Sequence, residues 1–520
     1  APDGNPLVGP VQGLTNFWCA CAVMAGFSQG GGVGLALANW MVEGDPGHDI
    51  FAMDVARYGE WATLRYTNAK VRENYSRRFS IRFPNEELPA ARPAETTPLY
   101  DIMLRDNFAV MGDSWGLETP LWFAPSAEEA HDVLSFHRSN DFEHVGAEVR
   151  GVREHVGVTE IANFAKYEVT GQGAEAWLDH LMTNTMPKVG RLVLSPMLNE
   201  RGKLIGDFTI ARAAQTRFLI WGSLAASRYH MRWFERHLPA DGSVRVHRFH
   251  TDLVGLMLAG PKTRAVLAAL VDTDVSNDAF RFMDFREMDV AGAPCMVNRI
   301  TYTGDLGYEI WMKPSFQRRV YLAIKTAGQA HGIVDFGMRA LLSMRLEKNF
   351  PTWFAELRPI YGPFEGAMDR FVKLQKPDFI GRAAAVAERD AGPRLRRVSL
   401  MIEAGDADVL GDEPIWAKVG ADHGTIEQPH GYGAPRFDAT GQEMPRPDPV
   451  RDGDWRVVGW VTSGGYAHWV QVSMAQGYLP AALAERGEAG LFAVEIMGER
   501  RAARIALEPP FDPAGERMRM

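Results

Sequence analysis

A β-hairpin is predicted by the stretch Arg299-Ile-Thr-Tyr-Thr-Gly-Asp-Leu-Gly-Tyr-Glu-Ile-Trp311. Ile300 and Tyr302 alternate with threonines, as in a strand that is buried on one face. Glycine and aspartate at positions 304–307 favour a turn, after which a β-type pattern resumes. The stretch is therefore expected to run strand, turn, strand.

Two acids, Asp305 and Glu309, and two tyrosines lie in or beside this turn. Taken alone, they fit an ordinary hairpin whose acids face water. The alternative is that they form one wall of a ligand site, and the rest of the chain must decide between the two.

The composition is that of a soluble globular protein with two to four domains. The chain has 520 residues, of which 46% are hydrophobic and 23% charged. A formal net charge of −9 argues against a nucleic-acid-binding surface. No apolar run is long enough to span a bilayer, and the first residues lack the pattern of a signal peptide. Neither nucleic acid nor a membrane is an expected partner.

The three cysteines, Cys19, Cys21 and Cys295, are too few for a disulfide framework. A reducing compartment follows, and a cytoplasmic location is expected. The spacing Cys19-x-Cys21 is not that of a zinc knuckle, and no second Cys/His pair follows nearby. No metal site is therefore predicted.

A glycine cluster, Ser28-Gln-Gly-Gly-Gly-Val-Gly34, follows an apolar run of strand length at 17–27. After it, Val33, Leu37 and Trp40 have the spacing of one helix face. A glycine loop between a strand and a helix lets the backbone approach a ligand and offers free N–H groups to it. A plain glycine-rich turn fits equally well, and the pattern is not the dinucleotide-binding fingerprint.

Residues 128–385 have the pattern of one large α+β unit, with helices expected at 127–136 and 141–152. A strand is predicted over 203–212, with Asp207 in an apolar context. Because a buried carboxylate needs a hydrogen-bond or charge partner, Asp207 is a candidate site residue; a structural hydrogen bond is the alternative. After a linker at 386–394, short strands and frequent turns predict a small β-barrel or jelly-roll-like domain.

Several motifs in order resemble the aminomethyltransferase of the glycine cleavage system. They are Met197-Leu-Asn-Glu-x-Gly202 with Asp207, Tyr302-Thr-Gly-Asp-x-Gly-Tyr-Glu309, Arg339, Leu342 to Glu347, Val461-Thr-Ser-Gly-Gly465 and Gly477-Tyr-Leu-Pro480. Residues 5–127 resemble the end of the flavin domain and the central domain of dimethylglycine and sarcosine dehydrogenases, which fuse a flavin-dependent amine oxidase to such a transferase. The resemblance implies domains at 1–45, 46–127, 128–385 and 395–510.

The resemblance also implies a folate site and part of a flavin site. Asp207 matches the acid that faces the reactive nitrogens of tetrahydrofolate, where it can orient the folate, accept a proton or stabilise positive charge. The implied folate-binding residues are Met197, Leu198, Tyr302, Asp305, Tyr308, Glu309 and Arg339. The residues implied near FAD are Gly30, Gly31, Gly32 and Gly34.

At some positions the chain departs from the family pattern, which limits how far the family's site residues can be assigned to it. Where the aminomethyltransferase has two adjacent acids, this chain has Gly206-Asp207, and Gly222 stands where the family has asparagine. Position 305 is aspartate in place of glutamate. The 520 residues contain no N-terminal nucleotide-binding fingerprint, so the chain is expected to be a fragment, to rely on a second chain for the rest of the flavin domain, or to have lost flavin chemistry.

Three functions follow from the resemblance. The first is oxidative N-demethylation of a small methylated amine, such as dimethylglycine or sarcosine, with the one-carbon unit passed to tetrahydrofolate. The second is a folate-dependent methyl or aminomethyl transferase that works without flavin. The third is a non-catalytic regulatory subunit that has kept the fold.

Overall fold

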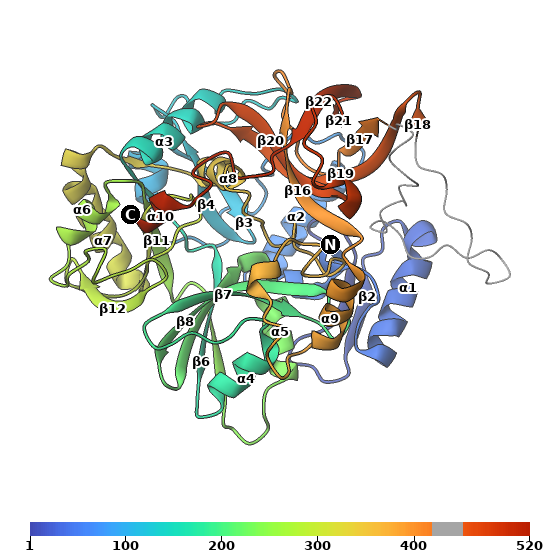
Figure 1. Cartoon of the computed structure of the whole chain (residues 1–520), viewed down its shortest axis with the longest axis horizontal. Coiled ribbons are helices and arrows are strands. Elements are labelled where there is room, and N and C mark those ends of the chain that lie inside the picture. The colour runs from blue at the N-terminus through green and yellow to red at the C-terminus, as the bar shows by residue number, and fades with distance from the viewer. Residues whose placement is uncertain (419–450) are drawn as a thin grey trace.

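Three large β-sheets organise the chain, and each packs on its own hydrophobic core. The computed structural model describes residues 1–418 and 451–520. In Figure 1 the first sheet lies at the bottom, the second at the left and the third at the top. This arrangement confirms the α+β fold class with a C-terminal barrel.

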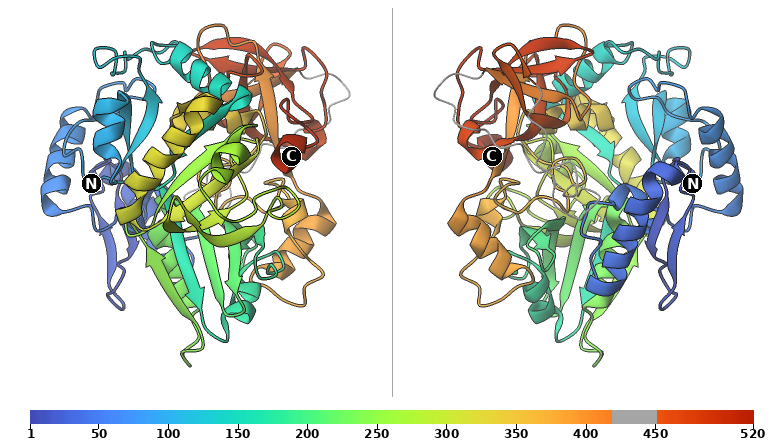
Figure 2. Two further views of the ribbon diagram at one scale, coloured as in Figure 1. Left: turned by 90° about the vertical axis from the view of Figure 1, so that its left-hand side faces the viewer. Right: turned by 90° about the vertical axis from the view of Figure 1, so that its right-hand side faces the viewer.

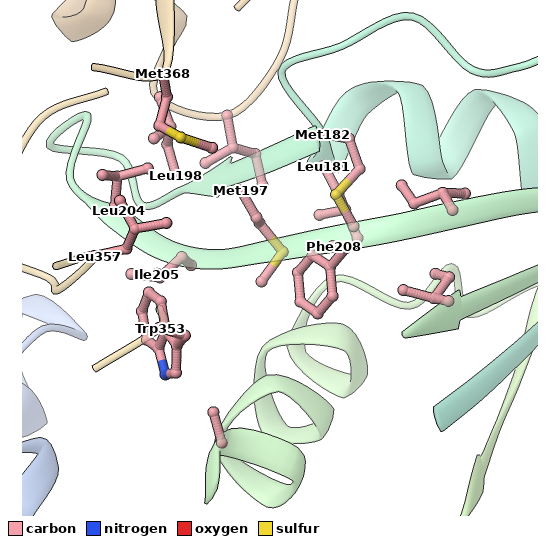
Figure 3. Packing of buried hydrophobic residues seen from close by; sticks show 14 of the residues in the cluster. Leu181, Met182, Met197, Leu198, Leu204, Ile205, Phe208, Trp353, Leu357 and Met368 are labelled. Carbon is pink, nitrogen blue, oxygen red and sulfur yellow. The ribbon is translucent and has the colours of Figure 1, made fainter. Parts of the chain in front are cut away.

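The first sheet is antiparallel, with five strands in the order β10–β6–β9–β8–β7. Its strands are β6 (Phe164–Thr170), β7 (Leu192–Leu198), β8 (Leu204–Ala214), β9 (Arg217–Ser223) and β10 (Arg245–Phe249). Helices α4 (Ala174–Leu181) and α5 (Ser227–Arg236) cover one face. Leu181, Met197 and Phe208 lie in the core between strands and helices (Figure 3).

The alternation of side chains along β8 directs Asp207 away from this core. Successive residues of a strand point to opposite faces of the sheet. Phe208 and Ile210 are buried in the core, whereas Asp207 and Thr209 are only partly buried. The predicted strand is confirmed, and its acid lies on the face opposite α4 and α5.

The second sheet has six strands in the order β12–β13–β14–β11–β5–β15. They are β5 (Val156–Glu160), β11 (Val254–Ala259), β12 (Phe285–Val290), β13 (Ala293–Asn298), β14 (Gly307–Met312) and β15 (Ile333–Asp335). Helices α6 (Thr263–Ala268) and α7 (Pro314–Gly328) cover its outer face. On its inner face Trp311 stacks on Trp221 of β9, with ring centroids 5.7 Å apart, so the two sheets face each other.

The predicted hairpin exists, but its first strand lies earlier in the sequence than expected. β13 pairs with β14, with Asn298 opposite Glu309, and residues 299–306 form a loop. Side chains satisfy this loop in place of a strand ladder: the Thr301 hydroxyl donates to the Asp305 carbonyl (3.0 Å), and Arg153 donates to the Thr303 carbonyl (2.7 Å). The residues that alternate like a strand therefore belong to an ordered loop. Its backbone carbonyls accept hydrogen bonds from the Thr301 hydroxyl and from the buried Arg153 and not from a neighbouring strand.

The third sheet closes into a barrel through the pairing of β17 with β19. Its strands are β16 (Leu395–Ile402), β17 (Pro414–Lys418), β18 (Arg451–Asp452), β19 (Trp455–Ala467), β20 (Val472–Pro480), β21 (Phe492–Ile496) and β22 (Glu499–Ile505). Within the predicted 395–510 domain, residues 419–450 lie outside the described residues. Helices α3 (Phe142–Glu154), α8 (Met338–Leu346), α9 (Arg382–Ala391) and α10 (Glu516–Arg519) complete the last two thirds of the chain.

The N-terminal region adds two small hairpins and two long helices. Its strands are β1 (Leu7–Pro10), β2 (Trp18–Cys21), β3 (Ala109–Ser114) and β4 (Leu117–Phe123). Its α-helices are α1 (Gly26–Glu43) and α2 (Leu64–Ser76), and a π-helical turn spans Ile102–Asp106. Figure 2 (right) shows α1 lying along the outside of the molecule.

Two local predictions are wrong. The glycine cluster at 30–34 is not a loop, because it lies inside α1, where Val33, Ala36 and Trp40 supply the buried face that holds the helix. Residues 127–136 form no helix: the Asn140 side chain accepts from the Val133 backbone N–H (2.9 Å) and donates to the His131 carbonyl (2.8 Å). Asparagine here competes with helical hydrogen bonding and folds the segment into turns.

Candidate functional site

The Asp207 carboxylate lacks the structural partner that would explain its place in a strand. Within residues 1–418 and 451–520 no ion pair or hydrogen bond joins this carboxylate to another residue. Burial raises its pKa to about 6. A partly buried acid with an open hydrogen-bonding capacity and a pKa near neutrality is poised to meet a ligand or to exchange a proton.

Tyr302, in the 299–306 loop, lies close to Asp207. Burial raises the pKa of its phenol to about 12, and the negative charges of Glu356 and Asp207 act in the same direction. The phenol donates to the Pro351 carbonyl, and its ring stacks on Phe350 at 5.8 Å. Asp207 and Tyr302 are therefore within electrostatic range of each other, and their sharing of one ligand stays a prediction.

A buried ion pair behind Tyr302 fixes this part of the site. Glu356 pairs with Arg345 of α8 (3.2 Å) and accepts from the Thr352 backbone N–H (2.7 Å). It also accepts hydrogen bonds from the hydroxyls of Thr462 and Ser463 on β19. Burial alone would raise the pKa of Glu356, but Arg345 and these donors outweigh it and lower the pKa. The carboxylate is therefore ionised and structural.

Glu309 and Asn298 form a second polar pair, on the inner face of the second sheet. The Asn298 amide donates to the Glu309 carboxylate (3.2 Å), and burial raises the pKa of Glu309 to about 7. In the described part of the chain the Asn298 carbonyl oxygen and the Trp221 indole N–H are buried without a hydrogen-bond partner. Because buried polar atoms are normally satisfied, these two mark a place where a polar ligand would bind.

Four residues face one another across the space between the first two sheets; together with Tyr302 and Glu356 they are called the inter-sheet site. Asp207 and Trp221 come from the first sheet, and Glu309 and Asn298 from the second, joined by the Trp221–Trp311 stack. The site offers two carboxylates with raised pKa values, one free amide oxygen and one free indole N–H. Such groups can accept hydrogen bonds from N–H donors, donate one hydrogen bond and exchange a proton near neutral pH.

The structure gives four other predicted site residues different partners. Tyr308 follows the opposite face of β14 and stacks on Phe280 at 5.6 Å, in the core under α6 and α7. Asp305 is fully buried in ion pairs with Arg153 and Arg517. Met197 and Leu198 lie in the core beside α4 (Figure 3).

Arg339 is also held elsewhere. Its guanidinium binds two carboxylates, Asp132 at 2.7 Å and Asp141 at 2.8 Å, which tie α8 to the segment before α3. Arg345, one helical turn and a half further along, is the α8 arginine that reaches the site through Glu356. The sequence shows that Arg339 and Arg345 lie in an otherwise apolar helix, but it does not show which of the two faces the site.

The four predicted flavin-site glycines, at positions 30–32 and 34, line α1. A Cβ added at any of them would meet no described atom within 4 Å. The same helix exposes Phe27, Met41 and Val42. Contact of these glycines with a flavin stays a prediction.

The described residues offer neither a metal cluster nor a membrane-spanning helix. Among the described residues, no three His, Cys, Asp or Glu side chains gather closely enough to hold a metal ion. No helix in residues 1–418 or 451–520 combines the length and apolar character needed to cross a membrane.

Three protein families match the chain. The GCVT N-terminal domain matches residues 99–376, the FAD dependent oxidoreductase central domain residues 43–97, and the glycine cleavage T-protein C-terminal barrel domain residues 435–512. The matches follow one another along the chain in the order that the sequence motifs predict.

Similar proteins include mitochondrial dimethylglycine dehydrogenase of Mus musculus, 34% identical over 98% of this chain and 54% of that protein. Mitochondrial sarcosine dehydrogenase of Homo sapiens is 27% identical over 100% of this chain and 58% of that protein. The chain thus spans a little over half the length of these relatives. The crystal structure of aminomethyltransferase T from Bartonella henselae has a TM-score of 0.62 at 22% identity, covering 81% of this chain and 98% of that chain, and shows the fold.

The GCVT N-terminal domain alone accounts for more than half of the 520 residues. The region that it matches contains both facing sheets and every residue of the inter-sheet site, from Asp207 to Glu356. The chain belongs to the glycine cleavage T-protein family and is a homologue of the dimethylglycine and sarcosine dehydrogenases.

Proposed function

We propose that this chain is the folate-binding part of an enzyme that oxidatively removes a methyl group from a small amine of the dimethylglycine or sarcosine type. The one-carbon unit passes to tetrahydrofolate. The names of the relatives support the substrate class. The observation that carries the proposal is Asp207, a carboxylate on the inner face of β8 with a raised pKa and no partner among the described residues, within electrostatic range of Tyr302.

The residues of the inter-sheet site fit a reduced pterin. Its edge carries paired N–H donors, which match the Glu309 carboxylate and the unpaired Asn298 oxygen. The Trp221 N–H, also unpaired, offers a donor to a pterin acceptor. When bound, tetrahydrofolate supplies nitrogen nucleophiles that take up carbon at the oxidation level of formaldehyde.

Asp207 has a defined task in this proposal. Two protons leave the folate nitrogens when they take up one carbon, and one of them returns to the departing amine. A carboxyl group with a pKa of about 6 can hold such a proton near neutral pH and release it again. In its ionised form it also stabilises positive charge on the one-carbon donor.

Removal of hydride from the methyl group requires an oxidant, and we propose FAD in this role. Gly30, Gly31, Gly32 and Gly34 on α1 are the residues of this chain that we assign to its vicinity, because no described atom fills the space beside them. The rest of the flavin domain would belong to a longer chain or to a second chain. We propose a cytoplasmic location, since the cysteines are free thiols.

Tetrahydrofolate binding to the purified chain tests the proposal. Isothermal titration should show a binding site in the wild type. Asp207→Asn should fold with unchanged thermal stability and still bind folate, but lose catalysis of formaldehyde capture as methylenetetrahydrofolate, measured as the rate above the uncatalysed condensation. Asp272→Asn, at an exposed acid, is the matched control.

Two results would contradict this assignment. Formaldehyde capture that survives in Asp207→Asn would make Asp207 a structural residue. Absence of any folate binding in the wild type would favour the non-catalytic, regulatory role.

A further inference from the structure

Residues 511–520, which include α10, lie against the loop at 299–306 and are called the clasp. After β22 the chain leaves the barrel and passes the end of α8. There the Phe511 backbone N–H donates to the Glu347 carbonyl (3.1 Å). The clasp therefore begins at a fixed point beside α8.

Asp512 holds the short helix α10 in place. Its carboxylate accepts hydrogen bonds from the backbone N–H groups of Glu516 (3.0 Å) and Arg517 (3.1 Å). The Lys348 ammonium group donates to the Asp512 carbonyl (2.5 Å) and lies 3.7 Å from the Asp512 carboxylate. Because a carboxylate that accepts the first N–H groups of a helix caps it, α10 has a defined direction.

This helix contacts both ends of the loop. The Arg517 guanidinium donates to the Asp305 carboxylate (2.7 Å), and the Arg299 guanidinium donates to the main-chain oxygen of Met520 (2.6 Å). Arg299 and Asp305 are both buried. Tyr302 lies midway between these two residues along the chain, so α10 restrains the loop on both sides of it.

The clasp also covers Arg153, the buried arginine that donates to the Thr303 carbonyl. The guanidinium carbon of Arg153 lies 3.5 Å from the ring centroid of Phe511, and Arg517 donates to the Arg153 carbonyl. A desolvated guanidinium is stabilised by the face of an aromatic ring. The clasp thus supports the loop directly and also through Arg153.

We propose that Arg517 is a positioning residue, which holds the loop through Asp305 and so places Tyr302 at the inter-sheet site. The inference rests on the proposed folate site. Without this contact the loop samples more conformations, and a smaller fraction of the molecules presents Tyr302 to the ligand. The apparent affinity falls by that fraction.

Hydrogen exchange of the loop amides tests the clasp. Arg517→Gln should speed exchange at 299–306 by about 2- to 5-fold, the value of one partly exposed ion pair. Arg517→Lys keeps the charge and should restore most of the protection. Arg519→Gln is the matched control on the same helix: Arg519 is exposed, and within the described part of the chain it donates to the Ala514 carbonyl (2.8 Å) and forms no ion pair.

Titration with tetrahydrofolate tests the link to Tyr302. Arg517→Gln should weaken binding by about 2- to 5-fold, and Arg519→Gln should not. In a Tyr302→Ala background, which keeps Asp207 and Glu309, Arg517→Gln should have no further effect, because the residue that it positions is gone. A purely structural contribution would give the same loss in both backgrounds.

Two results would overturn the proposal: loop exchange that is unchanged in Arg517→Gln, or an equal loss of affinity with and without the Tyr302 side chain. A wild type that binds no tetrahydrofolate is a different result. It refutes the folate site together with the positioning role, and hydrogen exchange then decides alone whether Arg517 holds the loop.

Discussion

The substitution Asp305→Asn tests whether Asp305 stabilises the fold around the site or contacts the ligand. The side chains of Asp305, Arg153 and Glu347 are fully buried, and Arg153 pairs with both acids. Arg517, at 2.7 Å from Asp305, covers this group from the C-terminal segment. Asp305→Asn would leave the buried Arg153 and the partly exposed Arg517 with one carboxylate fewer.

The expected loss of stability is large. Removing one partner of a buried ion pair costs about 3–5 kcal/mol, because the remaining charge stays desolvated. Arg153 keeps Glu347 and the Thr303 carbonyl, and Arg517 can turn toward water, so the lower end applies: about 3 kcal/mol. The free energy of unfolding, measured by urea denaturation with tryptophan fluorescence, should fall by this amount.

Folate affinity distinguishes the two roles of Asp305. Measured at low temperature, where the variant stays folded, tetrahydrofolate binding should weaken by less than about tenfold, since Tyr302 and Asp207 remain. Tyr308→Phe, in the core under α7, is the control and should leave folate affinity unchanged. A variant of wild-type stability that loses folate binding entirely would show that Asp305 contacts the ligand and refute the structural assignment.

Three further predictions address the site. Since burial raises the pKa of Glu309 to about 7 and its ionised form accepts N–H donors, folate affinity should rise between pH 6 and 8; Glu309→Gln should flatten this profile. Trp221→Phe keeps the ring stack and removes the free N–H, so folate binding should weaken about tenfold, roughly the value of one hydrogen bond. Glu356→Gln leaves Arg345 buried without a charge partner and should lower the unfolding free energy by about 3 kcal/mol.

Each of these has a result that would count against it. A folate affinity that is flat with pH in the wild type would mean that Glu309 does not meet the ligand. Trp233→Phe removes another unpaired indole N–H, on α5, and should leave folate affinity unchanged. If Trp233→Phe weakens folate binding as much as Trp221→Phe does, the loss in Trp221→Phe does not report a hydrogen bond to the ligand. Wild-type stability of Glu356→Gln in thermal denaturation would show that Arg345 finds another partner.

The sequence predicted the strands and their chemistry better than it predicted which residues meet. Asp207 was singled out because an acid within an apolar strand is costly unless it has a partner or a use; the structure gives it a raised pKa, and its role as a site residue stays a prediction. Tyr308 and Glu309 were both assigned to the folate, although adjacent residues of a strand point to opposite faces. Strand alternation alone therefore puts them on opposite faces, and the structure places Glu309 on the inner face beside Asn298.

Other features could not be read from the chain. The loop at 299–306 alternates like a strand, but its backbone is satisfied by the Thr301 hydroxyl and by the buried Arg153, which lies 150 residues before Thr303. The glycines of α1 suggested a loop because glycine disfavours helices, yet the burial of Val33 and Trp40 outweighs that cost. The Arg345–Glu356 pair depends on contacts between α8, a loop and the barrel that no local pattern encodes.

That last ion pair joins distant parts of the chain. Glu356 meets Arg345 of α8, Thr352 in the loop whose Pro351 carbonyl accepts the Tyr302 hydroxyl, and Thr462 on strand β19 of the barrel. We expect a ligand that displaces Tyr302 to disturb these contacts. By thermodynamic reciprocity, a change in the barrel that disturbs the same contacts would then alter the affinity for that ligand by the same free energy.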